Sequence, residues 1–151
     1  MWENIFTGQL LAILGAVIAF LVSGLGSSRG VALAGQTGAG VLTEDPSKFG
    51  SVIIMEALPS TQAIYGFVIA FLIIGNINDA MSLEAGFRLF LAGLPVGVVG
   101  FFSALYQGKV AASGIQLISK RPESLGSAIT LALMVEMFAI LALIVSILII
   151  G

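Results

Sequence analysis

The sequence predicts an all-α membrane protein with four transmembrane helices, arranged as two helical hairpins in tandem. The first observation behind this prediction is composition: 58% of the 151 residues are hydrophobic, and only six are basic and eight acidic. The mean hydropathy of +1.13 exceeds that of ordinary soluble domains. The absence of cysteine and histidine from the sequence excludes disulfide frameworks, Cys/His zinc sites and imidazole bases. The scattered charges form no basic patch, so no nucleic-acid partner is predicted.

The second observation is that charged residues separate long apolar stretches. A bilayer core about 30 Å thick requires about 20 helical residues, which each stretch supplies. The predicted helices cover residues 5–40, 48–76, 83–117 and 124–150. Turn-forming residues fill the breaks between them, at 43–47, 75–79 and 119–123. The chain therefore reads as two hairpins, 1–79 and 80–151, within one membrane domain.

The third observation is an internal repeat. The segment 46–51 (PSKFGS) is matched by 122–127 (PESLGS), 76 residues further on. Before the loops the offset is 79, because Val31-Ala32 and Gly35 match Val110-Ala111 and Gly114. Both copies run in the same direction, unlike the inverted repeats of many transporters. A parallel duplicated hairpin favours assembly into a homo-oligomeric ring.

Glycine is concentrated in the first and third predicted helices. Spacings such as Gly26-x-x-x-Gly30 and Gly93-x-x-x-Gly97 allow the backbones of membrane helices to approach closely. We therefore expect these two helices to pack tightly as an inner layer. The second and fourth helices, rich in Leu, Ile and Phe, are expected to form an outer layer facing lipid.

The distribution of basic residues predicts the orientation. Lys48, Lys120 and Arg121 lie in the loops within the hairpins, whereas Arg88 is alone at the other side. The positive-inside rule then places the hairpin loops in the cytoplasm and both termini outside. The N-terminus lacks the basic region of a cleavable signal peptide, so the first helix is expected to remain in the mature protein.

The strongest candidate for a functional residue is Glu136, near the middle of the last predicted helix. An ionisable group at this depth costs at least about 2.5 to 3.5 kcal/mol, which makes it a functional candidate by default. On the second helix, Thr61 and Gln62 lie at similar depth on one helical face, and Gln107 adds an amide from the third helix. Pro59 removes one backbone hydrogen bond nearby. These oxygen donors suit a hard monovalent cation, which would also neutralise the carboxylate.

The two halves differ at these positions. Glu136 aligns with Ser60, and Gln107 aligns with Ser28. Each chain is therefore expected to hold one ion, bound by side chains from both hairpins. The alternative is that Gln and Thr only join helices by hydrogen bonds. That reading accounts poorly for several polar groups converging on one carboxylate.

The chain resembles the membrane rotor-ring subunits (subunit K, or proteolipid) of bacterial V-type (V/A-type) sodium-translocating ATPases. The residues that carry the resemblance are 58–66 (LPSTQAIYG), 105–112 (LYQGKVAA) and 134–141 (MVEMFAIL). The resemblance implies the following sodium ligands: the Leu58 carbonyl, the Thr61 hydroxyl, the Gln62 and Gln107 amides and the Glu136 carboxylate. It also implies that Tyr65 hydrogen-bonds to that carboxylate.

The resemblance further implies a rotary function without catalysis by this chain itself. About ten identical subunits would form a ring with closed symmetry in the bilayer. Each Glu136 would collect Na+ from a half-channel in a stator subunit and release it near an essential stator arginine. ATP hydrolysis would occur in a soluble head, joined to the ring by central-stalk subunits.

Two alternative functions remain open. With Glu136 protonated, the same ring would carry H+, and Thr61, Gln62 and Gln107 would be hydrogen-bond partners only. A stand-alone ion-coupled carrier is the second alternative, and the parallel repeat with its glycine-dense helices argues against it.

Two features depart from the family pattern. Met137 stands where a threonine is common, and Glu56 is a second carboxylate one turn from Ser60. Glu56 could face a wet crevice, pair with a basic group such as Lys109, or be protonated. Arg29 and Lys109 occupy near-equivalent places, and their simplest interpretation is snorkelling toward the cytoplasmic interface.

Overall fold

The computed structural model describes residues 7–151 of the chain, and within this range it contains four helices long and apolar enough to span a membrane. The first is α1 (Gly8–Glu44). The second span consists of η1 (Pro46–Lys48), α2 (Phe49–Ala57), η2 (Leu58–Ser60) and α3 (Thr61–Gly75). The third is α4 (Leu83–Lys120), and the fourth is η3 (Pro122–Ser124) with α5 (Leu125–Ile150). The predicted all-α membrane fold is confirmed.

The helix ends follow from local capping. Thr7 and Ser82 precede α1 and α4 in extended conformation, and each side-chain oxygen accepts a bond from a first-turn backbone N–H, at 3.2 Å in both cases. At the other end α1 and α4 run to Glu44 and Lys120, further than the predicted ends at 40 and 117. The predicted turns are correspondingly shorter, because a 3₁₀ turn beginning at Pro46 or Pro122 starts the returning helix almost at once. The predicted start of the first helix at residue 5 lies outside the described residues.

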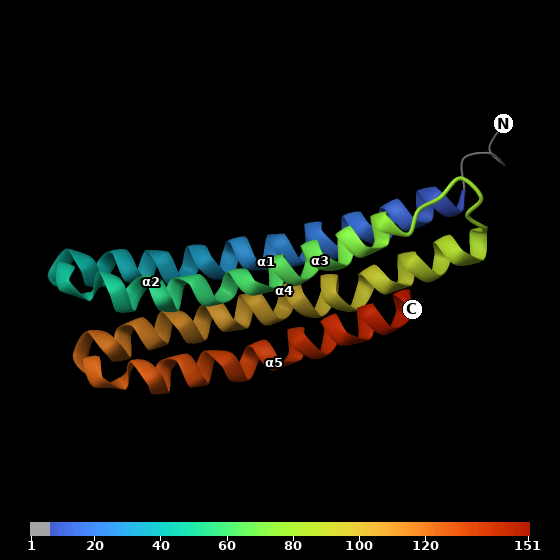
Figure 1. Cartoon of the computed structure of the whole chain (residues 1–151). Coiled ribbons are helices and arrows are strands. Elements are labelled where there is room, and N and C mark those ends of the chain that lie inside the picture. The colour runs from blue at the N-terminus through green and yellow to red at the C-terminus, as the bar shows by residue number, and fades with distance from the viewer. Residues whose placement is uncertain (1–6) are drawn as a thin grey trace.

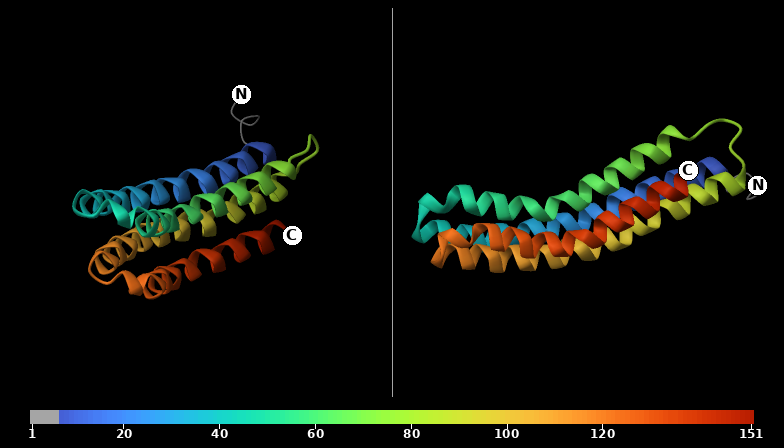
Figure 2. Two further views of the ribbon diagram at one scale, coloured as in Figure 1. Left: turned by 60° about the vertical axis from the view of Figure 1, so that its left-hand side comes forward. Right: turned by 60° about the horizontal axis from the view of Figure 1, so that its bottom comes forward.

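The four spans form two hairpins that lie side by side along their whole length (Figure 1). Both intra-hairpin loops lie at one end of the bundle, whereas the start of α1 and the end of α5 lie at the other. Two further views show the bundle as an elongated, gently bent body with α1 and α4 adjacent (Figure 2). The parallel repeat in the sequence therefore becomes two parallel hairpins in space.

The predicted close packing of the first and third membrane spans is confirmed. Gly86 of α4 faces the backbone of Gly8 in α1, and Gly108 faces that of Gly30, so closely that a methyl group at either α4 glycine would overlap the opposing backbone. Since lipid offers no hydrophobic drive for helix association, such close backbone contact is the main attraction available. The inner layer that α1 and α4 would form in a ring stays a prediction.

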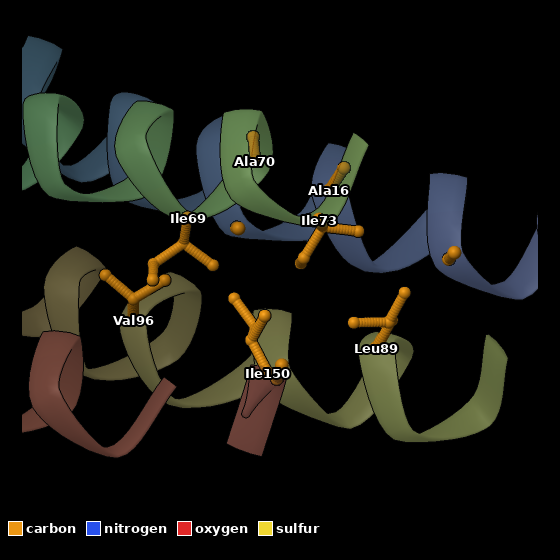
Figure 3. Packing of buried hydrophobic residues seen from close by; sticks show 10 residues of the cluster. Ala16, Ile69, Ala70, Ile73, Leu89, Val96 and Ile150 are labelled. Carbon is orange, nitrogen blue, oxygen red and sulfur yellow. The ribbon is translucent and has the colours of Figure 1, made fainter. Parts of the chain in front are cut away.

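Two buried apolar clusters lie above and below the middle of the bundle. In the cluster nearer the chain ends, Ile69 and Ile73 of α3 pack on Val96 and Leu89 of α4 and on Ile150 of α5 (Figure 3). The cluster nearer the loops includes Met55, Ile115 and Ala132. Between the two clusters lies a layer of buried polar side chains.

Candidate functional site

Glu136 lies in this polar layer, on the face of α5 that packs against the rest of the bundle. Only 4% of its surface is exposed. Tyr65 of α3 donates its hydroxyl to Glu136 Oε1 at 2.5 Å, and Gln107 of α4 donates Nε2 to Glu136 Oε2 at 3.2 Å. Each carboxylate oxygen thus accepts a hydrogen bond from a different helix. Among residues 7–151 no lysine or arginine lies within ion-pair distance of this carboxylate.

The two glutamines form a continuous hydrogen-bonded chain across the bundle. Gln62 of α3 donates Nε2 to Gln107 Oε1 at 2.7 Å, and both side chains are fully buried. Gln107 Nε2 also donates to the Ala132 carbonyl of α5 at 3.2 Å. The orientation of Gln107 is therefore fixed from two sides, with its amide nitrogen directed at α5 and its oxygen toward α3.

Ser103 also belongs to this series of hydrogen-bonded side chains, and it was not predicted from the sequence. Its hydroxyl accepts a bond from Gln62 Nε2 at 3.2 Å and donates to the Val135 carbonyl at 3.0 Å. A usable signal existed, because Ser103 precedes Gln107 by four residues and so shares its helical face. With Gln62 Nε2 directed at Ser103 and Gln107, Gln62 Oε1 lies on the side of Thr61.

The third part of the site is the interruption between α2 and α3. Pro59 has no N–H, and the helix adopts the predicted irregularity as the 3₁₀ segment Leu58–Ser60. The Leu58 carbonyl accepts the backbone N–H of Thr61 and, at 3.0 Å, its hydroxyl. Thr61 Oγ1 lies 3.4 Å from Gln62 Oε1. Three oxygens from one turn of the helical segment are therefore grouped beside the amide chain.

Helix α1 supports this segment with small polar residues. Ser27 Oγ accepts the backbone N–H of Ala63 at 3.0 Å, just after the interruption. A methyl group at Gly66 of α3 would overlap Ser23 Oγ and the Ala19 carbonyl of α1. The segment that carries Thr61, Gln62 and Tyr65 is thus held directly against the α1 backbone.

The repeat-equivalent positions do not form a second site within the chain. Ser28 donates its hydroxyl to Leu25 O at 3.0 Å, and Ser60 donates to Ala57 O at 2.6 Å, so both serines are satisfied by their own helices. In the second hairpin, Gln107 and Glu136 bring an amide and a carboxylate together, whereas their aligned positions in the first hairpin are both serines. All six residues singled out from the sequence, from Leu58 to Glu136, lie in one connected layer.

Glu56 lies outside this layer. It is half-buried on α2, and a methyl group added at Gly35 would lie 2.5 Å from Glu56 Oε1, so the carboxylate rests on the α1 backbone. The suggested pairing of Glu56 with Lys109 does not occur within the chain: in the described part, the single ion pair within 4 Å joins Lys48 and Asp45.

The snorkelling expected of Arg29 and Lys109 is not observed. The guanidinium of Arg29 lies 6.0 Å from the centre of the Phe101 ring, and Lys109 Nζ lies 5.3 Å from the centre of the Tyr106 ring. Because Tyr106 is one turn further from the loops than Lys109, the ammonium group does not extend toward the loop end. Attraction to the face of an aromatic ring offers each cation a local partner instead.

Chemically, the site offers one carboxylate, two amide oxygens, a hydroxyl and a backbone carbonyl. These are oxygen donors of the kind that bind hard cations, and they carry a single negative charge. Within residues 7–151 no cluster of three or more His, Cys, Asp or Glu residues could hold a multivalent metal. The arrangement therefore fits a monovalent cation or a proton better than a divalent ion.

Comparison with known proteins agrees with the internal repeat. The family model for the C subunit of ATP synthase matches twice, at residues 14–73 and 90–149, which correspond to the two hairpins. The V-type sodium ATPase subunit K of Enterococcus hirae is 44% identical, over 95% of this chain and 92% of the relative. The A-type ATP synthase subunit K of Methanocaldococcus jannaschii is 37% identical, over 92% of this chain and 61% of the relative.

A more distant relative is the human V-type proton ATPase 16 kDa proteolipid, which is 30% identical over 91% of this chain and 89% of its own length. Both family matches extend over a full hairpin, and the similarity to subunit K covers nearly the whole chain. Two tandem membrane hairpins, each matching the same family model, identify this chain as a multi-pass membrane protein that belongs to the family of ATP synthase C subunits.

Proposed function

We propose that this chain is the ion-carrying subunit of the rotor ring of a V-type sodium ATPase and binds one Na+ at Glu136. The observation that carries the proposal is a buried carboxylate near mid-span, hydrogen-bonded by Tyr65 and Gln107 and lacking a basic partner within residues 7–151. A bare negative charge in this position is costly in lipid. A bound cation neutralises the charge, so Glu136 can face the bilayer only while it carries the transported ion.

The ligands we propose for Na+ are the Leu58 carbonyl, the Thr61 hydroxyl, the amide oxygens of Gln62 and Gln107, and Glu136. Supporting this set, Leu58 O, Thr61 Oγ1 and Gln62 Oε1 are grouped on one side of the amide chain. A carbonyl oxygen has two acceptor positions, so Gln107 Oε1 can accept from Gln62 and still bind a cation. Tyr65 is proposed to hold the carboxylate in place rather than to bind the ion.

In the proposed mechanism about ten copies form a closed ring that turns against a stator subunit. Each site loads Na+ from a stator half-channel, crosses the lipid in neutral form, and releases the ion when a stator arginine approaches Glu136. Moving each ion against 100 mV costs about 2.3 kcal/mol, which the soluble ATPase head supplies through its central stalk. This chain binds and carries the ion, and catalysis takes place elsewhere in the complex.

We also propose that the hairpin loops face the cytoplasm and the termini face outward. Lys48, Lys120 and Arg121 lie at the two hairpin loops together with Glu44, Asp45 and Glu123, whereas the other end has Arg88 with Asp79 and Glu84. The excess of basic residues at the loop end favours this orientation.

The proposal is tested by carbodiimide labelling of the purified ring over a range of pH, with the modified residue identified by mass spectrometry. Carbodiimides react with protonated carboxyl groups in apolar surroundings, so Glu136 is expected to be modified when sodium is absent. Millimolar Na+ is expected to protect it, whereas the same concentration of a large cation such as choline is not. Glu136→Gln serves as the control for labelling at any other carboxyl group.

A different outcome selects a different function. If the extent of Glu136 labelling is the same with and without Na+, the ring carries H+ rather than Na+. The human relative is named as a subunit of a proton ATPase, which is consistent with this alternative. Absence of labelling at Glu136, or labelling of Glu56 in its place, would refute the assignment of the site. The higher identity to the sodium ATPase subunit, 44% against 30%, favours sodium.

A further inference from the structure

Glu56 is a carboxylate in an apolar helix that the proposed ion site does not use. It lies ten residues after Pro46, which at 1.5 Å per residue places it about 15 Å from the loop end. Lys109 lies eleven residues before Lys120, at about the same depth. Two opposite charges therefore occur at one level of the bundle, and within the described chain they do not form an ion pair.

Glu56 lies next to a groove on the free side of the first hairpin. Ser60 and Ala63 line this groove from the second span, and Val31 and Ala32 line it from α1. Glu56 precedes Ser60 by one turn and contacts Gly35, which follows Val31 by one turn. Glu56 and Gly35 thus lie one turn nearer the loops than Ser60 and Val31, which line the groove.

The internal repeat shows which surface would cover this groove. Within the chain, the first hairpin presents Met55 and Gln62 to the second hairpin, and both side chains are fully buried. Their counterparts 76 residues later, Leu131 and Phe138, are 58% and 65% exposed. The contact face that the first hairpin uses is therefore repeated on the second hairpin, where it is free.

The opposing half of this contact is repeated as well. Ala132 belongs to the buried cluster that contains Met55, and its counterpart 76 residues earlier is Glu56. Suppose that the first hairpin of a second copy packs on α4 and α5 in the way that α4 and α5 pack on the first hairpin of their own chain. Glu56 of the second copy then takes the place of Ala132 and meets Leu131, the counterpart of Met55.

Leu131 and Lys109 line one groove between α4 and α5. Lys109 is exposed there, and its only described partner is the aromatic ring of Tyr106.

We propose that Glu56 of one copy forms an ion pair with Lys109 of the neighbouring copy at each contact between subunits. This inference rests on the proposed ring, and it assigns Glu56 a role distinct from ion transport. Packing of a second copy would withdraw both groups from water, and each would then neutralise the other. The pair would also fix the register between copies, because the surrounding contacts are apolar and permit sliding.

The direct test converts the ion pair into a covalent bond in purified, membrane-reconstituted protein. At mildly acidic pH a carbodiimide activates the Glu56 carboxyl group in those copies in which it is protonated. Lys109 Nζ then displaces the activating group as urea, leaving an amide between the two side chains. We expect denaturing gels to show cross-linked dimers and higher multimers, with the Glu56–Lys109 amide identified by mass spectrometry of the digested bands. Glu56→Gln and Lys109→Gln should each abolish this product, although amides between loop carboxylates and lysines can persist.

Native mass spectrometry of the same sample separates the two proposals. Rings without the Glu56–Lys109 amide would overturn the ion pair and leave the ring intact. The amide found only in bands of monomer mobility would also overturn it, because the pair would then lie within one chain. Protein that stays monomeric in bilayers and mild detergent would overturn the ring, and the inter-subunit pair with it.

A charge exchange provides an independent measurement. Glu56→Lys places two cations together, and we expect the ratio of ring to dissociated subunit on heating to fall about tenfold or more. The double variant Glu56→Lys with Lys109→Glu should bring most of this ratio back. A double variant no more stable than Glu56→Lys alone would refute the pairing, whereas restoration is not expected from two unrelated sites.

Discussion

Replacing Gln107 by leucine tests how the polar layer produces ion affinity. Leucine has similar volume, so the main change is loss of the amide. The substitution removes one proposed ligand oxygen, the donor to Glu136 Oε2 at 3.2 Å and the acceptor that Gln62 uses at 2.7 Å. Gln62 Nε2 keeps Ser103 as a partner at 3.2 Å, so the fold is expected to survive.

The magnitude follows from the bond to the carboxylate. A hydrogen bond to a charged group contributes about 1.5 to 3 kcal/mol, and every 1.4 kcal/mol is tenfold in an equilibrium constant. The Na+ concentration that half-protects Glu136 from carbodiimide is therefore expected to rise about ten- to a hundredfold in Gln107→Leu. Loss of the ligand oxygen acts in the same direction.

The matched control is Gln116→Leu, which makes the same chemical change on the same helix at an exposed position. Sodium protection in this control should stay close to that of the parent chain. Equal sodium protection in Gln107→Leu and in the parent would refute the proposed ligand set, provided both proteins form rings of the same mass.

Three further predictions concern the surroundings of the site and the loop. Gly26→Ala would place its methyl group 2.5 Å from the Phe101 carbonyl oxygen. Because overpacking costs about 1 to 3 kcal/mol, this substitution should lower the unfolding temperature of the ring. The control Gly40→Ala has open space around the added methyl group and should leave the unfolding temperature unchanged. Ser103→Ala should weaken sodium protection by only about two- to tenfold, because it removes neutral hydrogen bonds worth about 0.5 to 1.5 kcal/mol; a loss as large as that of Gln107→Leu would contradict this ranking. In the first hairpin loop, bonds from the Ser47 hydroxyl and backbone N–H hold the pKa of Asp45 below its usual 3.8. These hydrogen bonds stabilise the loop above pH 3.8, and the stabilisation is lost as the pH falls through the lowered pKa of Asp45. Ser47→Ala should therefore raise the pKa of Asp45 in a carbon-13 NMR titration. An unchanged pKa would show that the Ser47 hydroxyl is not the cause.

The arrangement of polar groups also explains why the site spans two hairpins. Glu136 and Gln107 come from the second hairpin, whereas Tyr65 and Gln62 come from the first. The equivalent serines, Ser28 and Ser60, bond to their own helices, so a chain with two hairpins carries one carboxylate layer rather than two. On the proposed function, each chain would thus carry one ion for every two hairpins of the ring.

Much of the fold was predictable because the membrane limits the alternatives. Lipid offers no hydrogen bonds, so apolar stretches of sufficient length must form helices, and the charged residues between them mark the turns. Repeats at 46–51 and 122–127 fixed the parallel relation of the hairpins, and Pro59 marked the interruption that the structure places at Leu58–Ser60. Glu136 was identifiable because a carboxylate at mid-span is costly unless something neutralises it.

Other features depended on the tertiary structure, since they arise from contacts between distant residues. Ser103 gained its significance only when α3 came within hydrogen-bond distance of its hydroxyl. The positions of Arg29 and Lys109 over aromatic rings were decided by side-chain packing that depth alone does not specify. Glu56 lies against Gly35 of α1 and forms no ion pair with Lys109 in the described chain, a placement that only helix packing decides. The sequence by itself determined which groups must lie in the membrane, and the packing of helices decided which of them meet.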